Sequence, residues 1–223
     1  MAGRNMKNFY IGIAVLAIGG AGAIWMVRAD SQGAGPQLVD PLPVTGESFA
    51  GYILGSDSAP VQITEFADFQ CPACAQFAVL AGPDVKQRLV ASGQVRWVFK
   101  DFPLDMHRNA VPAHLAAACA DEQGQFWTMH DQIFFRLGEW AESRRPERTF
   151  RGYARDMGID MDQYDECMDS RRHAGRIARS RQDGAQLGVA STPTFIIGNL
   201  RVSGSITYDS LTVLVNRVAA AAR

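Results

Sequence analysis

Cysteine is scarce in this chain, with four among 223 residues, so a small scaffold held together by many disulfides is excluded. Neither sign of charge dominates: 22 basic and 23 acidic side chains give a net charge of −1, which offers nucleic acid no general attraction. The chain also lacks an internal repeat, a phosphate-binding glycine loop and a low-complexity tract. With 47% hydrophobic residues, it has enough apolar material for one domain with a full core plus an appendage.

The longest apolar stretch covers residues 9–27 and is free of charge. A helix of this length, at about 1.5 Å per residue, crosses a hydrocarbon core of about 30 Å. Arg4 and Lys7 precede the stretch, which favours a cytosolic N-terminus over residues 1–8 and a domain outside the cytosol. The sequence therefore predicts a membrane anchor. The alternative is a cleaved signal peptide with secretion of the domain, because residues 27–29 loosely fit a cleavage site.

Residues 28–46 are rich in glycine and proline and are predicted to form a semi-extended linker without a core of its own. The linker is too short for a dimerisation module, so a monomer is expected. Beyond it, strand patterns near residues 48–54, 61–66, 95–100, 194–197 and 200–203 surround a long helical stretch, and a last helix is expected at 208–221. This order predicts an α/β core at 47–104 and 190–223, interrupted by a helical insertion at 105–189.

The motif Cys71-Pro72-Ala73-Cys74 stands where a strand meets a helix. The alternating residues 61–66 predict the strand, and Pro72 is tolerated in a first helical turn, where its missing N–H would be unpaired anyway. Cys71 is therefore expected at a helix N-terminus, where free N–H groups and the macrodipole stabilise a thiolate. Cys74 follows one turn later, close enough to close a disulfide. The pattern indicates disulfide exchange.

Two other interpretations of this motif are a zinc half-site and a structural bridge. A structural zinc site needs a second pair of ligands at short spacing, but Cys119 and Cys167 are far from each other in sequence and no histidine stands near Cys71. We therefore predict no metal. His114 and His130 fall on apolar helix faces and are expected to be core histidines rather than ligands. Five arginines between residues 171 and 181 are expected to form a solvated helix face, or a surface that meets anionic lipid headgroups.

A second candidate segment lies far downstream, at residues 191–199 (STPTFIIGN). A proline placed before a buried strand suggests a fixed X–Pro bond, of either isomer. The alternative is that Pro193 merely starts an edge strand.

Three motifs in this order, residues 66–74 (FADFQCPAC), 99–104 (FKDFPL) and 192–195 (TPTF), resemble the DsbA-like branch of the thioredoxin superfamily. The helical residues 117–131 between them are similar to that branch's insertion. The resemblance covers residues 47–222 and implies a thioredoxin-like fold with a helical insertion domain.

The resemblance also implies roles for single residues. Cys71 would be the nucleophile and Cys74 the resolving cysteine, with Pro193 as a cis-proline facing them. Thr192 would offer backbone groups to an incoming substrate strand, and Pro72 and Ala73 would line the same contact surface. Glu65, six residues before Cys71, would be a partly buried acid that accepts the proton of Cys74. The alternative for Glu65 is a solvated strand residue.

One position departs from the family: DsbA itself has a histidine where this chain has Ala73, and a methyl group cannot help to stabilise the thiolate. How oxidising the pair is therefore stays open. Cys119 and Cys167 are expected to form a structural disulfide, because cysteines of an exported chain tend to pair and relatives in this branch often carry such a bridge. Two free buried thiols are the alternative.

The function predicted from these observations is an extracytoplasmic thiol:disulfide oxidase that needs no cofactor. Its substrates would be exported proteins with cysteines, and a membrane redox partner would reset the Cys71–Cys74 pair. A membrane-tethered reductase, for example one serving cytochrome maturation, and a peptide-binding or chaperone module with a vestigial cysteine pair are the alternatives.

Overall fold

The computed structural model describes residues 35–39 and 49–221. The chain divides into two units, residues 1–35 and residues 36–223, and the described helices and strands belong to the second unit. The predicted anchor or signal segment at 9–27, the N-terminal residues 1–8 and most of the linker lie outside the described residues. None of the described helices combines the length and the apolar character that crossing a membrane requires.

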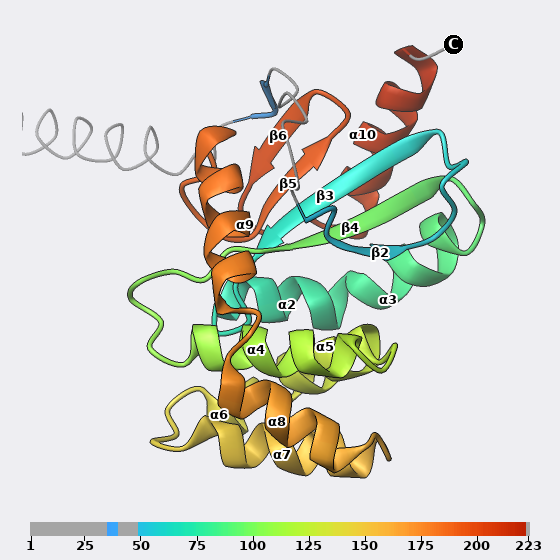
Figure 1. Cartoon of the computed structure of the whole chain (residues 1–223). Helices are drawn as coiled ribbons and strands as arrows, with labels where there is room; N and C mark the ends of the chain where they lie inside the picture. Colours follow the sequence, from blue (N-terminus) through green and yellow to red (C-terminus); the bar gives the residue numbers. More distant parts are fainter. Residues whose placement is uncertain (1–34, 40–48, 222–223) are drawn as a thin grey trace, which may run out of the picture. The chain divides into compact units, whose positions relative to one another are not determined.

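One mixed sheet forms the centre of the described unit (Figure 1). The strands lie side by side in the order β1-β6-β5-β3-β4-β2. The central pair, β3 and β4, is parallel, and the other neighbours are antiparallel. The strands are β1 (Gln37–Leu38), β2 (Tyr52–Leu54), β3 (Val61–Ala67), β4 (Val95–Asp101), β5 (Thr194–Ile197) and β6 (Leu200–Ser203).

Strand β3 positions the site. The alternation of its apolar residues gives way to continuous burial over its last three residues, because helices cover both faces of the sheet at this end. Its register sets Glu65 opposite Phe99 of β4 and Phe195 of β5, in the middle of the sheet. A carboxyl side chain is thereby held inside the protein.

Helices cover the sheet in layers (Figure 1). Helices α2 and α10 pack on one face of the sheet, and α5 packs against α2. Helix α9 covers the opposite face, where Gly184 approaches Phe66 and Phe102. Helices α7 and α8 form a further layer under α4. The helices are α2 (Pro72–Leu80), α3 (Gly82–Asp84), the π-helix η1 (Val85–Val90), α4 (Ala110–Asp121), α5 (Phe126–Phe135), α6 (Leu137–Trp140), α7 (Pro146–Asp156), α8 (Met161–Ser170), α9 (Ala174–Gln186) and α10 (Tyr208–Ala221).

The fold is a thioredoxin-like α/β core with a helical insertion, as the sequence predicted. Two large buried clusters support it. One joins the sheet to the insertion through Phe69, Phe99 and Phe134. The other joins α2 and α10 to the sheet through Phe77 and Phe195, among others. The first cluster also contains Cys71 and Cys74, so the cysteine motif packs where the sheet meets the insertion.

Three features of the fold differ from those predicted by more than one residue. Strand β2 starts at Tyr52 rather than near residue 48, because Gly51 adopts φ +101°, outside strand geometry. The insertion's first helix starts at Ala110 rather than 105. Within the predicted linker, Gln37–Leu38 form β1 against the edge strand β6, and the Val39 N–H donates to the Asn199 carbonyl at 2.9 Å. The extended linker thus contributes to the sheet.

The predicted solvated arginine face is wrong for Arg176. Its guanidinium donates to Asp101 Oδ2 at 3.3 Å and to the Tyr52 hydroxyl, and it lies 3.9 Å from the Phe49 ring centroid. Asp101 is fully buried, and His114 Nδ1 lies 2.7 Å from its other oxygen. Arg176 therefore links α9 to the sheet, as the counter-charge of a buried carboxylate.

Candidate active site

Cys71 occupies the N-cap position of α2, with extended backbone angles (φ −73°, ψ 121°). Pro72 takes the first helical position, where a missing N–H costs nothing. The Cys71 carbonyl accepts the first helical hydrogen bond, from the Ala75 N–H at 3.1 Å. The strand-to-helix junction expected from the sequence is therefore present, and it aims the free N–H groups of the first turn at the Cys71 sulfur.

Asp68 braces the loop in front of Cys71. Its buried carboxylate accepts from the Gln70 N–H at 2.7 Å and from the Leu104 N–H at 2.8 Å, and His107 Nδ1 lies 2.7 Å away. The Cys71 N–H donates to the Asp68 carbonyl at 3.0 Å. Sequence reasoning missed this brace, whose only local signal is an aspartate two residues before the N–H that it binds. These bonds also hold residues after β4 in a loop, which explains the late start of α4.

The downstream segment meets Cys71 across 121 residues of sequence. Cys71 Sγ lies 3.3 Å from the Thr192 carbonyl oxygen, to which it donates when protonated, and the Thr192–Pro193 peptide bond is cis. Pro72 is exposed, Ala73 is half-buried and Thr192 is buried. The structure thus places the predicted nucleophile, the predicted cis-proline and the predicted substrate-contact residues together.

Both cysteines of the motif are free thiols, so the structure represents the dithiol state. The pKa of Cys71 is lowered from 9.0 to about 5. The main cause is a hydrogen bond from the Cys74 thiol. Burial opposes the shift, while the Thr192 hydroxyl and the backbone N–H groups of Cys74 and Ala73 add to it. Cys71 is therefore a thiolate at neutral pH, and the helix N-terminus supplies part of its stabilisation.

Cys74 and Glu65 have the opposite character. Cys74 is fully buried, and burial, followed by the hydrogen bond and charge of Cys71, raises its pKa well above the ordinary value. Burial also raises the pKa of Glu65 to about 8, against the hydrogen bond that Trp97 Nε1 donates to Oε2 at 3.2 Å. Glu65 is therefore not the solvated strand residue of the alternative interpretation. Near neutral pH the site holds one thiolate, one thiol and one neutral carboxyl group.

The Thr192 hydroxyl gives a first prediction. Thr192 Oγ1 is buried and has no hydrogen-bond partner in the described part of the chain, so it is available to a Cys71 thiolate. Replacing Thr192 with Val keeps the side chain's shape and removes the donor. We expect the pKa of Cys71 to rise on the order of one unit, from the loss of one charge-assisted hydrogen bond.

Thiolate absorbance against pH measures this pKa in the reduced protein. Thr194→Val is the matched control, because the Thr194 hydroxyl donates to the Ser191 carbonyl at 2.7 Å instead. An unchanged pKa in Thr192→Val, or an equal rise in both variants, would contradict the assignment.

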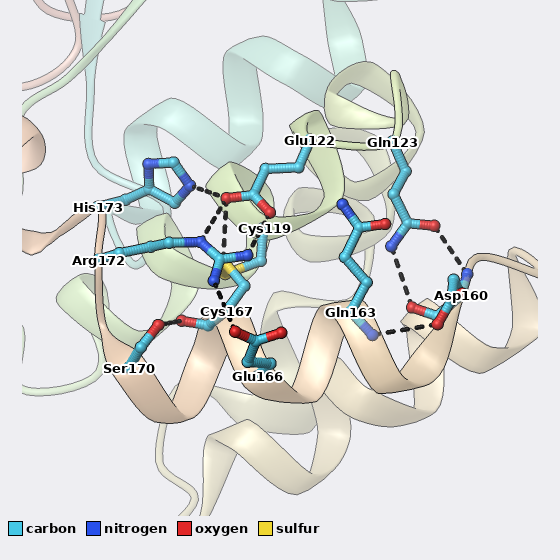
Figure 2. A network of polar contacts seen from close by, with 10 residues as sticks. All are labelled: Cys119, Glu122, Gln123, Asp160, Gln163, Glu166, Cys167, Ser170, Arg172 and His173. Carbon is cyan, nitrogen blue, oxygen red and sulfur yellow. Dashed lines mark hydrogen bonds and ion pairs between the residues drawn. A yellow bond between two sulfur atoms is a disulfide. The ribbon is translucent and has the colours of Figure 1, made fainter.

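Cys119 of α4 and Cys167 of α8 are joined in a disulfide, with an S–S distance of 2.03 Å. Figure 2 shows Glu122 beside it, between Arg172 and His173. Arg172 donates to both Glu122 oxygens, at 2.8 and 2.6 Å, and His173 Nε2 lies 2.7 Å from Oε1. These ion pairs lower the pKa of Glu122 to about 2, with the Arg172 hydrogen bond as the largest cause.

Among the described residues, one group of potential metal ligands lies close together: Glu122, Cys167 and His173. The sulfur is bonded to Cys119 and the carboxylate to Arg172, so these ligand atoms are already engaged. Neither Cys71 nor Cys74 belongs to such a group among the described residues. The cluster therefore ties α4 to the start of α9 next to the disulfide.

Comparison with known proteins identifies relatives of this fold and motif. The profile of the family described as "Thioredoxin" (Thioredoxin_4) matches residues 47–217. The protein named "Probable disulfide bond formation protein D" from Bacillus anthracis is 26% identical over 168 residues, which cover 74% of this chain and 76% of that protein. The crystal structure of Wolbachia pipientis alpha-DsbA1 superposes with a TM-score of 0.70 at 19% identity, over 82% of this chain and 94% of that one.

A protein named Na(+)/H(+) antiporter NhaA 3 from Salinispora tropica is more similar in sequence, at 34% identity over 234 residues. The match covers 99% of this chain but 34% of the antiporter. The chain thus spans about a third of the length of the first curated relatives that it matches. Their name describes proteins that extend far beyond the matched segment.

Proposed function

The chain belongs to the thioredoxin family, and on this basis we propose that it is a thiol:disulfide oxidoreductase, an oxidase that donates its Cys71–Cys74 disulfide to cysteine pairs of exported proteins. The observation that carries this proposal is the asymmetry of the two sulfurs. Cys71, at the N-terminus of α2, has a pKa of about 5, whereas the pKa of buried Cys74 is raised. One sulfur is built to react and to leave, and the other to resolve.

The exchange follows from this asymmetry. A substrate thiolate attacks Cys71 in the oxidised protein, the Cys71–Cys74 bond breaks, and Cys74 leaves as a thiolate that takes a proton. A second substrate thiolate then attacks the substrate sulfur of the mixed disulfide and releases Cys71 as a thiolate. The substrate is oxidised by two electrons and the enzyme is reduced by two. Because Cys71 departs without needing a proton, its low pKa favours the second step.

The low pKa of Cys71 also favours the reduced enzyme, which makes the disulfide more oxidising. At pH 7 a thiol with a pKa of about 5 stabilises the reduced state by about 3 kcal/mol relative to an un-ionised thiol. This is about 60 mV for a two-electron couple. The helix N-terminus, Cys74 and Thr192 thereby supply stabilisation without the histidine that Ala73 replaces.

We expect the reduction potential to fall with pH at two different slopes. Between pH 5.5 and 7.5, one proton accompanies two electrons, because Cys71 is ionised in the reduced protein and Cys74 is not. The slope there should be about 30 mV per pH unit, against about 59 mV below pH 5, where both thiols are protonated. Equilibration with glutathione buffers across this range measures it. A slope of about 59 mV up to pH 8 would show that Cys71 has an ordinary pKa.

The value of the potential tests the direction of electron flow. A potential between about −120 and −180 mV at pH 7 supports the oxidase, since proteins that oxidise or isomerise disulfides lie in this range. A potential near −270 mV, with the cellular protein isolated in its reduced form, would favour the membrane-tethered reductase. The chaperone alternative requires a pair that does not exchange, and the lowered pKa of Cys71 argues against it.

The proposal includes a place and partners for the reaction. The apolar residues 9–27 support an anchor with residues 1–8 in the cytosol and the domain in the periplasm or cell envelope, and a cleaved signal peptide with secretion is the alternative. The Cys119–Cys167 disulfide supports an oxidising compartment. A membrane redox partner would restore the Cys71–Cys74 disulfide, with the domain acting as a monomer. We also propose that residues 47–104 and 190–223 form the thioredoxin-like core and that residues 105–189 form the helical insertion.

A further inference from the structure

A small cavity borders the side chain of Glu65. It measures about 20 Å³, which is room for one water molecule. Phe77, Trp97 and Trp127 give it apolar walls, and Lys86 and His130 also line it. A buried water needs two to four polar partners, and the Glu65 carboxyl, the Lys86 ammonium and a ring nitrogen of His130 can provide them.

Two of the residues that line this cavity, Lys86 and His130, belong to an ion-pair cluster with Asp131. Lys86 Nζ, from η1, donates to both oxygens of Asp131, at 2.6 and 2.8 Å. Within α5, His130 Nδ1 lies 2.8 Å from Asp131 Oδ1. This pairing leaves Nε2 as the ring nitrogen available to the cavity. The side chains of Lys86 and Asp131 are about one-third exposed, whereas Glu65 is 2% exposed, so the ion pair reaches solvent and the carboxyl group does not.

We propose that Lys86 and Asp131 are positioning residues that set the proton affinity of Glu65 across this cavity, and through it the pH range in which Cys74 takes part in exchange. The proposal rests on the oxidoreductase function proposed above. The two charged side chains belong to η1 and α5, outside the cysteine motif. His130 contributes by holding the Asp131 carboxylate against Lys86.

The signs of the interactions follow from the charges that face Glu65. Burial favours the neutral carboxyl group, and the Lys86 ammonium favours the carboxylate. Asp131 neutralises part of the Lys86 charge. From the other elements, Trp97 donates a hydrogen bond, Cys74 remains a thiol, and His130 is neutral at pH 7 because burial lowers its pKa. The Lys86–Asp131 pair is thus the ionised group next to the cavity.

The proton balance shows where Glu65 acts. When the Cys71–Cys74 bond breaks, the Cys74 sulfur leaves with the electron pair and takes a proton from neutral Glu65. The Glu65 carboxylate then recovers a proton from the cavity water, which solvent resupplies. Above the pKa of Glu65, about 8, this donor is lost and Cys74 must leave as a buried anion. The pH at which reduction of the disulfide slows therefore reports the pKa of Glu65.

Two charge-removing variants separate this role from a structural one. Lys86→Met keeps the length of the side chain and removes its charge, so the pKa of Glu65 should rise, on the order of one unit. Asp131→Asn leaves the Lys86 charge uncompensated, so the pKa should fall by a similar amount. Loss of packing alone would not move the pKa in opposite directions. Arg88→Met is the matched control, because Arg88 is an exposed cation of η1 whose counter-charge is Asp84.

The experiment has two readouts on the folded, oxidised protein. Carbon-13 NMR of the Glu65 carboxyl, assigned with Glu65→Gln, gives its pKa without any reaction. The rate of disulfide reduction by a small dithiol is then measured against pH, and the ratio of variant to wild-type rate cancels the reductant's own ionisation. We expect this ratio to exceed one above pH 8 in Lys86→Met and to fall below one above pH 7 in Asp131→Asn.

Unchanged pKa values in both variants, or shifts in the same direction, overturn the proposal. Opposite pKa shifts without matching changes in the rate profiles also overturn it, because Glu65 would then not control Cys74. Failure of the proposed function is a separate outcome: wild-type protein would leave a reduced substrate protein unoxidised in the same buffers, whatever the pKa of Glu65.

Discussion

Cys71→Ser is expected to reduce disulfide exchange to the uncatalysed background, whereas Cys74→Ser, given a substrate with a single cysteine, is expected to stop at a mixed disulfide between Cys71 and the substrate. The two sulfurs differ in access and in charge. Cys71 borders Thr192 and Pro193 and has a pKa of about 5. Cys74 is fully buried with a raised pKa, so at pH 7 it holds less thiolate than the roughly 3% of a free cysteine. It cannot substitute for Cys71.

The measurement mixes the oxidised enzyme with a stoichiometric amount of a reduced, unfolded substrate protein, followed by gel electrophoresis without reductant and by mass spectrometry. The substrate used with Cys74→Ser carries a single cysteine, because a second substrate thiolate would release Cys71. For the Cys74→Ser variant, Cys71 is first activated as a mixed disulfide with a small thiol. We expect this variant to pass to a covalent complex that dithiol releases, and Cys71→Ser to form none. A trapped complex through Cys74, or exchange that persists in Cys71→Ser, would reverse the assignment of the two roles.

Removal of the Cys119–Cys167 disulfide is expected to have the largest effect on stability. The bridge closes a loop of 48 residues, for which the chain-entropy model gives roughly 4 kcal/mol in the free energy of unfolding. For a domain of this size, at about 2–4 °C per kcal/mol, the melting temperature should fall by about 10 °C. Both positions are fully buried, so alanine is the suitable replacement, since a buried serine hydroxyl would need a partner.

Thermal unfolding of the Cys119→Ala/Cys167→Ala double variant tests this expectation. The reduction potential of the Cys71–Cys74 pair is the control, and it should not change, because none of the groups that shift the pKa of Cys71 belongs to this disulfide. A melting temperature equal to that of the wild type would show that the bridge adds nothing to stability. A changed potential would couple the insertion to the active site.

The fold was largely predictable because its signals are local. Alternating apolar residues predict β3 and β4, and the predicted bounds of β5, β6 and α10 match those of the structure. The predicted boundaries of helices and strands were wrong where a residue distant in sequence forms hydrogen bonds with the segment. Helix α4 starts late because Asp68, more than thirty residues earlier, binds the Leu104 N–H and His107. Strand β1 exists because β6 offers it an open edge.

The sequence by itself determined the position of the reactive cysteine, because a helix N-terminus and a Cys-Pro-Ala-Cys motif are short-range features. Only the tertiary structure decided the ionisation of the site. Glu65 is in phase with Val61 and Ile63 on the apolar face of β3, but this local pattern does not decide whether a carboxyl group near the strand end reaches solvent or is 2% exposed. Its burial depends on Trp97 of β4 and on helices supplied by other segments, and its nearby charge comes from Lys86 and Asp131. Electrostatic fields depend on distance in space, which the order of residues does not specify.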